Sequence, residues 1–148
     1  MFGVASLAGP DAKVDAEALQ PGRAPRRAFK ASYARPLITR DYRPANMPFN
    51  SEYPLIRFLE SMGYDVGYTS AVDTARRGHL LLNHKVFVSV GHDEYWSAPM
   101  RDHLEAYIAN GGNVAFFSGN TCCWQVRSQD RGNDLVCWKE AYEQDPLY

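Results

Sequence analysis

The spacing of hydrophobic residues changes from segment to segment along this 148-residue chain, and the spacing predicts which segments are helices and which are strands. Residues 54–62, PLIRFLESM, place apolar side chains three and four positions apart, as an amphipathic helix does, with proline in the first turn and Gly63 as the stop. Residues 64–69 alternate apolar and polar side chains and predict a strand. Residues 72–83 begin as a helix that Gly78 weakens.

A continuous apolar run follows and gives the strongest strand signal in the chain. Residues 86–90, VFVSV, are of the kind that is buried on both faces of a parallel sheet. Residues 97–110 predict a helix with Ser97 as its N-cap, proline in its first turn and two glycines after it. Residues 113–118, NVAFFS, predict another short strand. This alternation indicates an α/β fold with a three-layer, flavodoxin-like parallel sheet.

The two ends of the chain lack this regular pattern. Residues 1–30 contain three prolines and no lasting helical or strand period, which predicts a poorly ordered leader before one domain over residues 31–148. Residues 30–53 hold three prolines and three tyrosines and predict a loop with short extended pieces. Near the C-terminus, residues 135–138, LVCW, predict one more strand.

Composition argues against two classes of partner. The net charge of -1 and the pI near 6.4 leave no excess of basic residues of the kind that binds nucleic acid or an anionic membrane. No apolar run approaches the roughly 18 to 20 residues that cross a bilayer. The first residues also lack the pattern of a signal peptide. We therefore expect a cytoplasmic protein that binds neither nucleic acid nor a membrane.

Polar side chains gather directly after the two predicted strands 86–90 and 113–118. The first loop is GHDEYW, residues 91–96, and the second is SGNTCCW, residues 118–124. In open parallel sheets ligands bind outside the carboxyl ends of the strands, because loops and helix N-termini converge there. We therefore expect the two loops to face each other. Glu94 would lie near the apex of a sharp strand-to-helix turn that presents its carboxylate.

Helix capping, a catalytic triad and cysteine chemistry are three other possible roles for residues in and near these loops. His92, Asp93 and Glu94 would also serve as caps of the following helix, because acids are favoured at a helix N-terminus. A Ser118, His92 and Asp93 triad is disfavoured, since two members adjacent in sequence rarely share one hydrogen-bond line. The cysteines have no zinc-binding spacing and are expected to be reduced, buried thiols; they are Cys122, Cys123 and Cys137.

A long stretch of the chain resembles a known enzyme family. The stretch is residues 91–127, GHDEYWSAPMRDHLEAYIANGGNVAFFSGNTCCWQVR, and it resembles the C-terminal domain of the large subunit of N,N-dimethylformamidase and its relatives. The resemblance extends more loosely through residues 58–73 and 32–36. It implies a class I glutamine amidotransferase-like α/β domain, in agreement with the order of elements above. Family enzymes are several times longer, so it also implies a fragment with an incomplete sheet, truncated at its C-terminus.

The resemblance implies an activity and a cofactor. The family's enzyme hydrolyses N,N-dimethylformamide to dimethylamine and formate at a mononuclear ferric ion held by two tyrosinates and one glutamate. By resemblance Glu94 is the glutamate ligand, and His92 either supports the metal ligands from outside or is a catalytic acid/base group. The resemblance implies Tyr33 as one tyrosine ligand, with Tyr42 as the alternative. The family's other tyrosine ligand would lie before residue 30, where this chain has no tyrosine. Phenolate and carboxylate oxygens are hard ligands that suit Fe³⁺.

The two loops also predict a pocket and its partners. We expect a small-molecule amide substrate, and a homo-oligomer or the family's small partner subunit as protein partner. The alternative function is a noncatalytic α/β binding or assembly module of the same fold. The expected substrate contacts are Tyr95, Trp96, Asn120 and Trp124.

Overall fold

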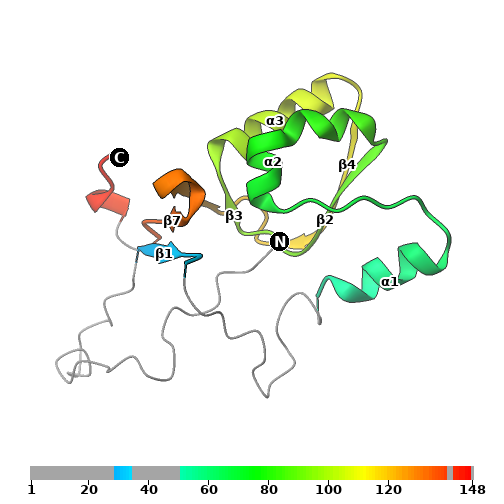
Figure 1. Ribbon diagram of the computed structural model, residues 1–148, viewed down its shortest axis with the longest axis horizontal. Coiled ribbons are helices and arrows are strands. Elements are labelled where there is room, and N and C mark those ends of the chain that lie inside the picture. Colours follow the sequence, from blue (N-terminus) through cyan, green and yellow to red (C-terminus); the bar gives the residue numbers. More distant parts are fainter. Residues whose placement is uncertain (1–28, 35–50, 140–141, 148) are drawn as a thin grey trace, which may run out of the picture.

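The computed structural model describes three parts of the chain: residues 29–34, 51–139 and 142–147. The fold is of the α/β type (Figure 1). Its longest strands, β2 (Val86–His92) and β4 (Asn113–Gly119), pair in parallel along all seven residues of each. Helix α3 (Ala98–Ala109) connects them. The strand–helix–strand unit predicted from the hydrophobic pattern is therefore confirmed.

The core lies between this strand pair and two helices. Helices α2 (Ala71–Arg77) and α3 lie together on one face of β2 and β4 (Figure 1). The predicted N-cap is confirmed, because the Ser97 hydroxyl accepts a hydrogen bond from the Met100 backbone N–H at 3.3 Å. Ile108 lies at the edge of the apolar stripe of α3 and is 49% exposed. The buried cluster consists of Leu81, Phe87, Trp96, Met100, Leu104 and Tyr107.

Helix α1 (Tyr53–Ser61) is the predicted amphipathic helix, yet none of its residues is buried. It ends as expected before Gly63, whose φ of +76° is a left-handed conformation that glycine adopts without strain. The strand predicted at residues 64–69 is wrong, since this segment pairs with no strand in the described chain. Instead the Tyr68 hydroxyl donates to Glu60 Oε1 at 2.5 Å and holds the segment against α1.

Gly78 marks the point where α2 gives way to a 3-10 helix, η2 (Gly78–Asn83). A Cβ atom on Gly78 would lie only 2.3 Å from both Cβ and Cγ of His103 on α3. The glycine therefore permits the close approach of the two helical segments. His103 is partly buried and lies against Gly78.

Replacing Gly78 with alanine is expected to lower the free energy of unfolding by about 2 kcal/mol, because the new methyl group has to displace the packed Cβ and imidazole ring of His103 on α3. Urea denaturation measures this change. His79→Ala, at the exposed next position, is the control and should stay within about 0.5 kcal/mol of the native chain. Equal stability of the two variants would contradict the close packing of α2 and η2 on α3.

The other described strands form two smaller sheets. An antiparallel sheet has the order β1 (Lys30–Ser32), β7 (Asp134–Val136), β6 (Arg127–Gln129). β7 corresponds to the last predicted strand. A parallel pair, β3 (Tyr95–Trp96) with β5 (Trp124–Gln125), follows directly on the ends of β2 and β4. Two short 3-10 helices are η3 (Asp130–Gly132) and η4 (Tyr142–Gln144).

The second face of the β2–β4 pair is largely open in the described residues. Its side chains include Val86 and Phe117, which are 49% and 65% exposed. The described part thus contains one helix layer over this parallel pair. The predicted leader lies outside the described residues, apart from Phe29 and Lys30. Among the helices of the described chain, none has the length and apolar character to cross a membrane.

Candidate functional site

The two polar loops meet at the carboxyl ends of β2 and β4, as the sequence predicted. The β3–β5 pairing joins them, and three backbone hydrogen bonds of 2.8 to 2.9 Å run from the second loop and β5 to the first loop and β3. Both loops therefore form one structural unit. The N–H groups of Cys122, Trp124 and Val126 donate to the carbonyl oxygens of Asp93, Glu94 and Trp96, respectively.

Asp93 points into the protein and ties this unit together. Its side chain is 0% exposed, and its two carboxylate oxygens accept hydrogen bonds from the Ser89 hydroxyl at 2.5 Å and the Trp96 indole N–H at 2.7 Å. Its backbone N–H donates to the Ser118 hydroxyl at 2.9 Å. Burial raises the pKa of Asp93 above its ordinary value, and the hydrogen bonds from Ser89 and Trp96 only partly oppose this.

These contacts exclude two interpretations of the first loop. Ser97 caps α3, so the acidic residues before it are not the helix cap. The Ser118, His92 and Asp93 triad does not form, because the Asp93 carboxylate contacts Ser89 and Trp96, as described above, and the Ser118 hydroxyl contacts the Asp93 backbone. Asp93 is instead a structural residue of the loop.

The Glu94 side chain points away from the buried Asp93 side chain. It lies among groups that hold it in one orientation. Its Oε1 accepts hydrogen bonds from Lys139 Nζ and from the Trp124 indole N–H, both at 3.1 Å. Its Oε2 lies 3.7 Å from His92 Nδ1, too far for a direct hydrogen bond. Partial burial raises the pKa of Glu94, but Lys139, Trp124 and His92 outweigh it and lower the pKa below the ordinary value. Glu94 is therefore an ionised carboxylate near neutral pH.

Lys139 is a site residue that sequence reasoning missed. Its Nζ donates to the Tyr95 hydroxyl at 2.9 Å as well as to Glu94, and it lies 5.2 Å and 5.4 Å from the ring centroids of Tyr95 and Trp124. The hydrogen bond to Tyr95 raises the pKa of Lys139, burial opposes this, and Glu94 adds to the rise. Lys139 lies 45 residues from Glu94 in sequence, just after β7, and no local sequence motif predicts that it belongs to the site.

His92 ends β2 with an accessible imidazole. Its side chain is 45% exposed, and its ring covers Gly119, where a Cβ atom would lie 3.0 Å from Nε2. Glycine at the end of β4 therefore makes room for this ring. His92, Glu94, Tyr95 and Trp124 are the predicted site residues that the fold brings together, with Lys139 added by the structure.

The other two expected pocket residues lie at the margins of this cluster. Trp96 is 5% exposed in the core, where its indole N–H donates to Asp93. Asn120 is exposed in the second loop with a positive φ of 49°, and its carbonyl oxygen accepts from the Cys123 N–H at 3.2 Å. As substrate contacts both stay predictions.

The cysteines differ from expectation in their exposure. Cys122 and Cys123 are exposed, and Cys137 is partly buried, whereas all three were expected in the interior. The tight loop explains the exposure of Cys122 and Cys123, because Cys122 has a φ of +58°, its N–H donates to the Asp93 carbonyl oxygen, and the Cys123 N–H donates to Asn120 within the loop. Cys122 borders a shallow cavity of about 170 Å³, which lies against Trp96, Leu104, Ile108 and Phe116.

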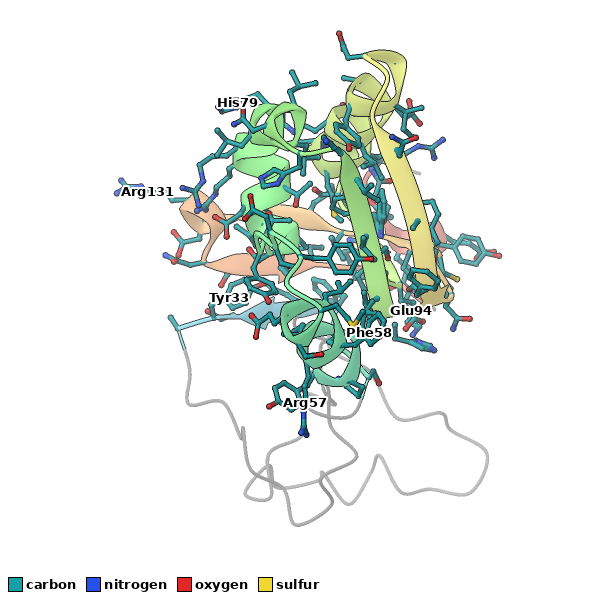
Figure 2. The ribbon with its side chains drawn as sticks, turned by 90° about the vertical axis from the view of Figure 1, so that its right-hand side faces the viewer. Tyr33, Arg57, Phe58, His79, Glu94 and Arg131 are labelled. Carbon is teal, nitrogen blue, oxygen red and sulfur yellow. The ribbon has the colours of Figure 1, made fainter. Side chains whose placement is uncertain are left out.

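Tyr33 lies away from this cluster. It follows β1, is 41% exposed, and its backbone N–H donates to the Asn133 carbonyl oxygen at 2.7 Å. Figure 2 shows Tyr33 and Glu94 in separate parts of the protein, Tyr33 beside the antiparallel sheet and Glu94 beyond the end of β2. Burial raises the pKa of Tyr33, which disfavours the phenolate that binds iron. Tyr42, the alternative ligand, lies outside the described residues.

Comparison with known protein families gives a match that spans most of the chain. The sequence model of a family described as N,N-dimethylformamidase beta subunit-like, C-terminal, matches residues 13–147. The matched range includes both loops and Lys139. The search of curated proteins found no match.

Proposed function

Because the chain belongs to the N,N-dimethylformamidase beta subunit-like, C-terminal family, we propose that it serves in the hydrolysis of an amide C–N bond, with N,N-dimethylformamide as the reference substrate. The observation that carries the proposal is the convergence of Glu94, His92 and Lys139 at the end of β2. An ionised carboxylate, an imidazole and an ammonium group at one place are able to carry out acid/base chemistry on an amide.

Each of these groups has a role that its position supports. Amide hydrolysis has to move one proton from the attacking water and deliver one to the leaving amine. His92 is accessible and its Nδ1 faces Glu94 Oε2, so the carboxylate orients the imidazole for proton transfer through a bridging water. Lys139 is the hydrogen-bond donor that would stabilise negative charge developing on the carbonyl oxygen.

A mononuclear iron ion at Glu94 is part of this proposal, and such an ion polarises a carbonyl and lowers the pKa of bound water. The described residues do not complete a ligand set for it. Tyr33 lies apart from Glu94, Glu94 Oε1 is already engaged by Lys139, and nowhere in the described chain do three or more His, Cys, Asp or Glu side chains form a group that could hold a metal. The roles above therefore rest on side chains of the chain itself.

The wider architecture is a proposal as well. The family description refers to a beta subunit, and we propose that the chain works with a partner, either a small subunit or a second copy. Further strands would complete the three-layer, class I glutamine amidotransferase-like sheet around the β2–α3–β4 unit. A cytoplasmic location belongs to the same proposal, because reduced exposed thiols suit that compartment.

The experiment is to purify the chain and measure amine release from N,N-dimethylformamide together with bound iron and the visible absorption of ferric phenolate. Turnover above the uncatalysed rate is the expected result. Stoichiometric iron without turnover would contradict hydrolysis of this amide. Iron-free, colourless and inactive protein would favour the noncatalytic binding or assembly module, for which the separation of Tyr33 from Glu94 is the supporting observation.

A further inference from the structure

One positive charge in the site is held by four separate contacts. Lys139 Nζ donates to Glu94 Oε1 at 3.1 Å and to the Tyr95 hydroxyl at 2.9 Å. The same atom lies 5.2 Å from the Tyr95 ring centroid and 5.4 Å from that of Trp124. The Trp124 distance is within the roughly 6 Å at which an aromatic face attracts a cation, whereas Tyr95 is contacted at its hydroxyl edge. The three partners therefore surround a point where a cation is stabilised.

The partners suit an organic ammonium ion in particular. An alkylammonium ion donates hydrogen bonds from its N–H groups and presents C–H groups, so a carboxylate, a hydroxyl and the Trp124 ring satisfy both parts of it. The indole N–H of Trp124 also donates to Glu94 Oε1, which fixes the carboxylate even without the lysine. The Glu94 side chain is only 15% exposed, and among the lysine and arginine side chains of the described residues Lys139 is the one that forms an ion pair with it.

We propose that Glu94, Tyr95 and Trp124 form a binding site for a small alkylammonium ion, and that Lys139 occupies it as the chain's own ligand. Binding of an ammonium ion at this site requires neither iron nor turnover. A failure to bind alkylammonium and a failure to hydrolyse the amide are therefore separate results. A protonated amine released from an amide belongs to the same chemical class, and this connection alone rests on the proposed function.

The test removes Lys139 and supplies the ammonium group from solution. Methylammonium chloride should bind to the Lys139→Ala variant with a dissociation constant of about 10 mM, since a ligand of two non-hydrogen atoms cannot bind much more tightly. At ten times that concentration the thermal midpoint of the variant should rise by about 3 °C above its value in equimolar sodium chloride. The native chain should show no such difference, because Lys139 fills the site.

Three controls make the result specific. Lys85→Ala removes an exposed lysine elsewhere and should respond to methylammonium and sodium alike. The double variants Lys139→Ala/Glu94→Gln and Lys139→Ala/Trp124→Leu should lose the methylammonium response. Lys139→Ser replaces Lys139→Ala if the latter does not fold, because its short polar side chain also leaves the place of the lysine ammonium group open. An identical response to methylammonium and sodium in the folded variant would overturn the proposal. So would a failure of both variants to fold in methylammonium.

Discussion

Replacing Asp93 with alanine is expected to lower the free energy of unfolding by about 3 kcal/mol. The side chain is 0% exposed, and its loss leaves the Ser89 hydroxyl without its carboxylate partner in the interior. The Trp96 indole N–H loses its shorter hydrogen bond and keeps only the one to the Asp93 carbonyl oxygen at 3.0 Å. Chemical denaturation followed by tryptophan fluorescence measures the change.

Asparagine at the same position separates the hydrogen bonds from the charge. Asp93→Asn can accept from Trp96 and donate to the Ser89 oxygen, so it should cost less than about 1 kcal/mol at neutral pH. Burial raises the folded-state pKa of Asp93 above its unfolded value, so its stabilising contribution is complete below the unfolded pKa and is lost as pH rises through the folded pKa. The native chain should therefore lose stability, relative to Asp93→Asn, as the pH rises through the raised folded-state pKa of Asp93.

The control for this prediction is Asp102→Ala, an exposed acid on α3 whose removal should change stability by no more than about 0.5 kcal/mol. If Asp93→Ala were no more destabilising than Asp102→Ala, the buried position of Asp93 would be refuted. A pH dependence of opposite sign would show that the hydrogen bonds outweigh burial.

Changing Glu94 to glutamine is expected to reduce amide hydrolysis by at least about 100-fold in kcat/KM. The substitution keeps the size of the side chain and an oxygen acceptor for Trp124 and Lys139. It removes the negative charge and can place an NH₂ group toward His92, where Oε2 now lies 3.7 Å from Nδ1. The imidazole would then lose the partner that orients it, and an iron ion would lose its proposed carboxylate ligand.

The measurements are steady-state hydrolysis and bound iron per chain, with thermal unfolding to show that the variant is folded. Glu105→Gln is a matched control, because this exposed glutamate on α3 contacts only Arg101 among the ion pairs described and should leave kcat/KM within about twofold. A folded Glu94→Gln variant with native activity and native iron content would remove Glu94 from the proposed chemistry.

The elements with strong local signals were predictable from sequence. The run at β2 and the Ser97 cap of α3 depend on neighbouring residues, and both are confirmed. The position of the two polar loops followed from parallel pairing alone. The strand predicted at residues 64–69 failed because alternation specifies a face but supplies no partner, and Tyr68 bonds to Glu60 instead.

The parts of the site that sequence could not supply depend on tertiary contacts. Asp93 and Glu94 are neighbouring acids of the same loop, yet one is buried in a hydrogen-bond network and the other faces the cluster. Only the path of the backbone through the β3–β5 pair decides which of the two acids is buried and which faces the cluster. Lys139 follows β7 and joins the site across 45 residues, and its side chain carries no pattern that would mark it among the other basic residues.

The joining of the two loops also determines how this region opens. Because backbone hydrogen bonds connect the segment around Asp93 with that around Trp124, neither loop can separate from the other without breaking the β3–β5 pairing. Local unfolding should therefore be cooperative, with the amide protons of Cys122, Trp124 and Val126 exchanging with solvent together. Access to Glu94 through loop movement would then be an all-or-none event, in which the orientation of the carboxylate and the second loop are lost at the same time.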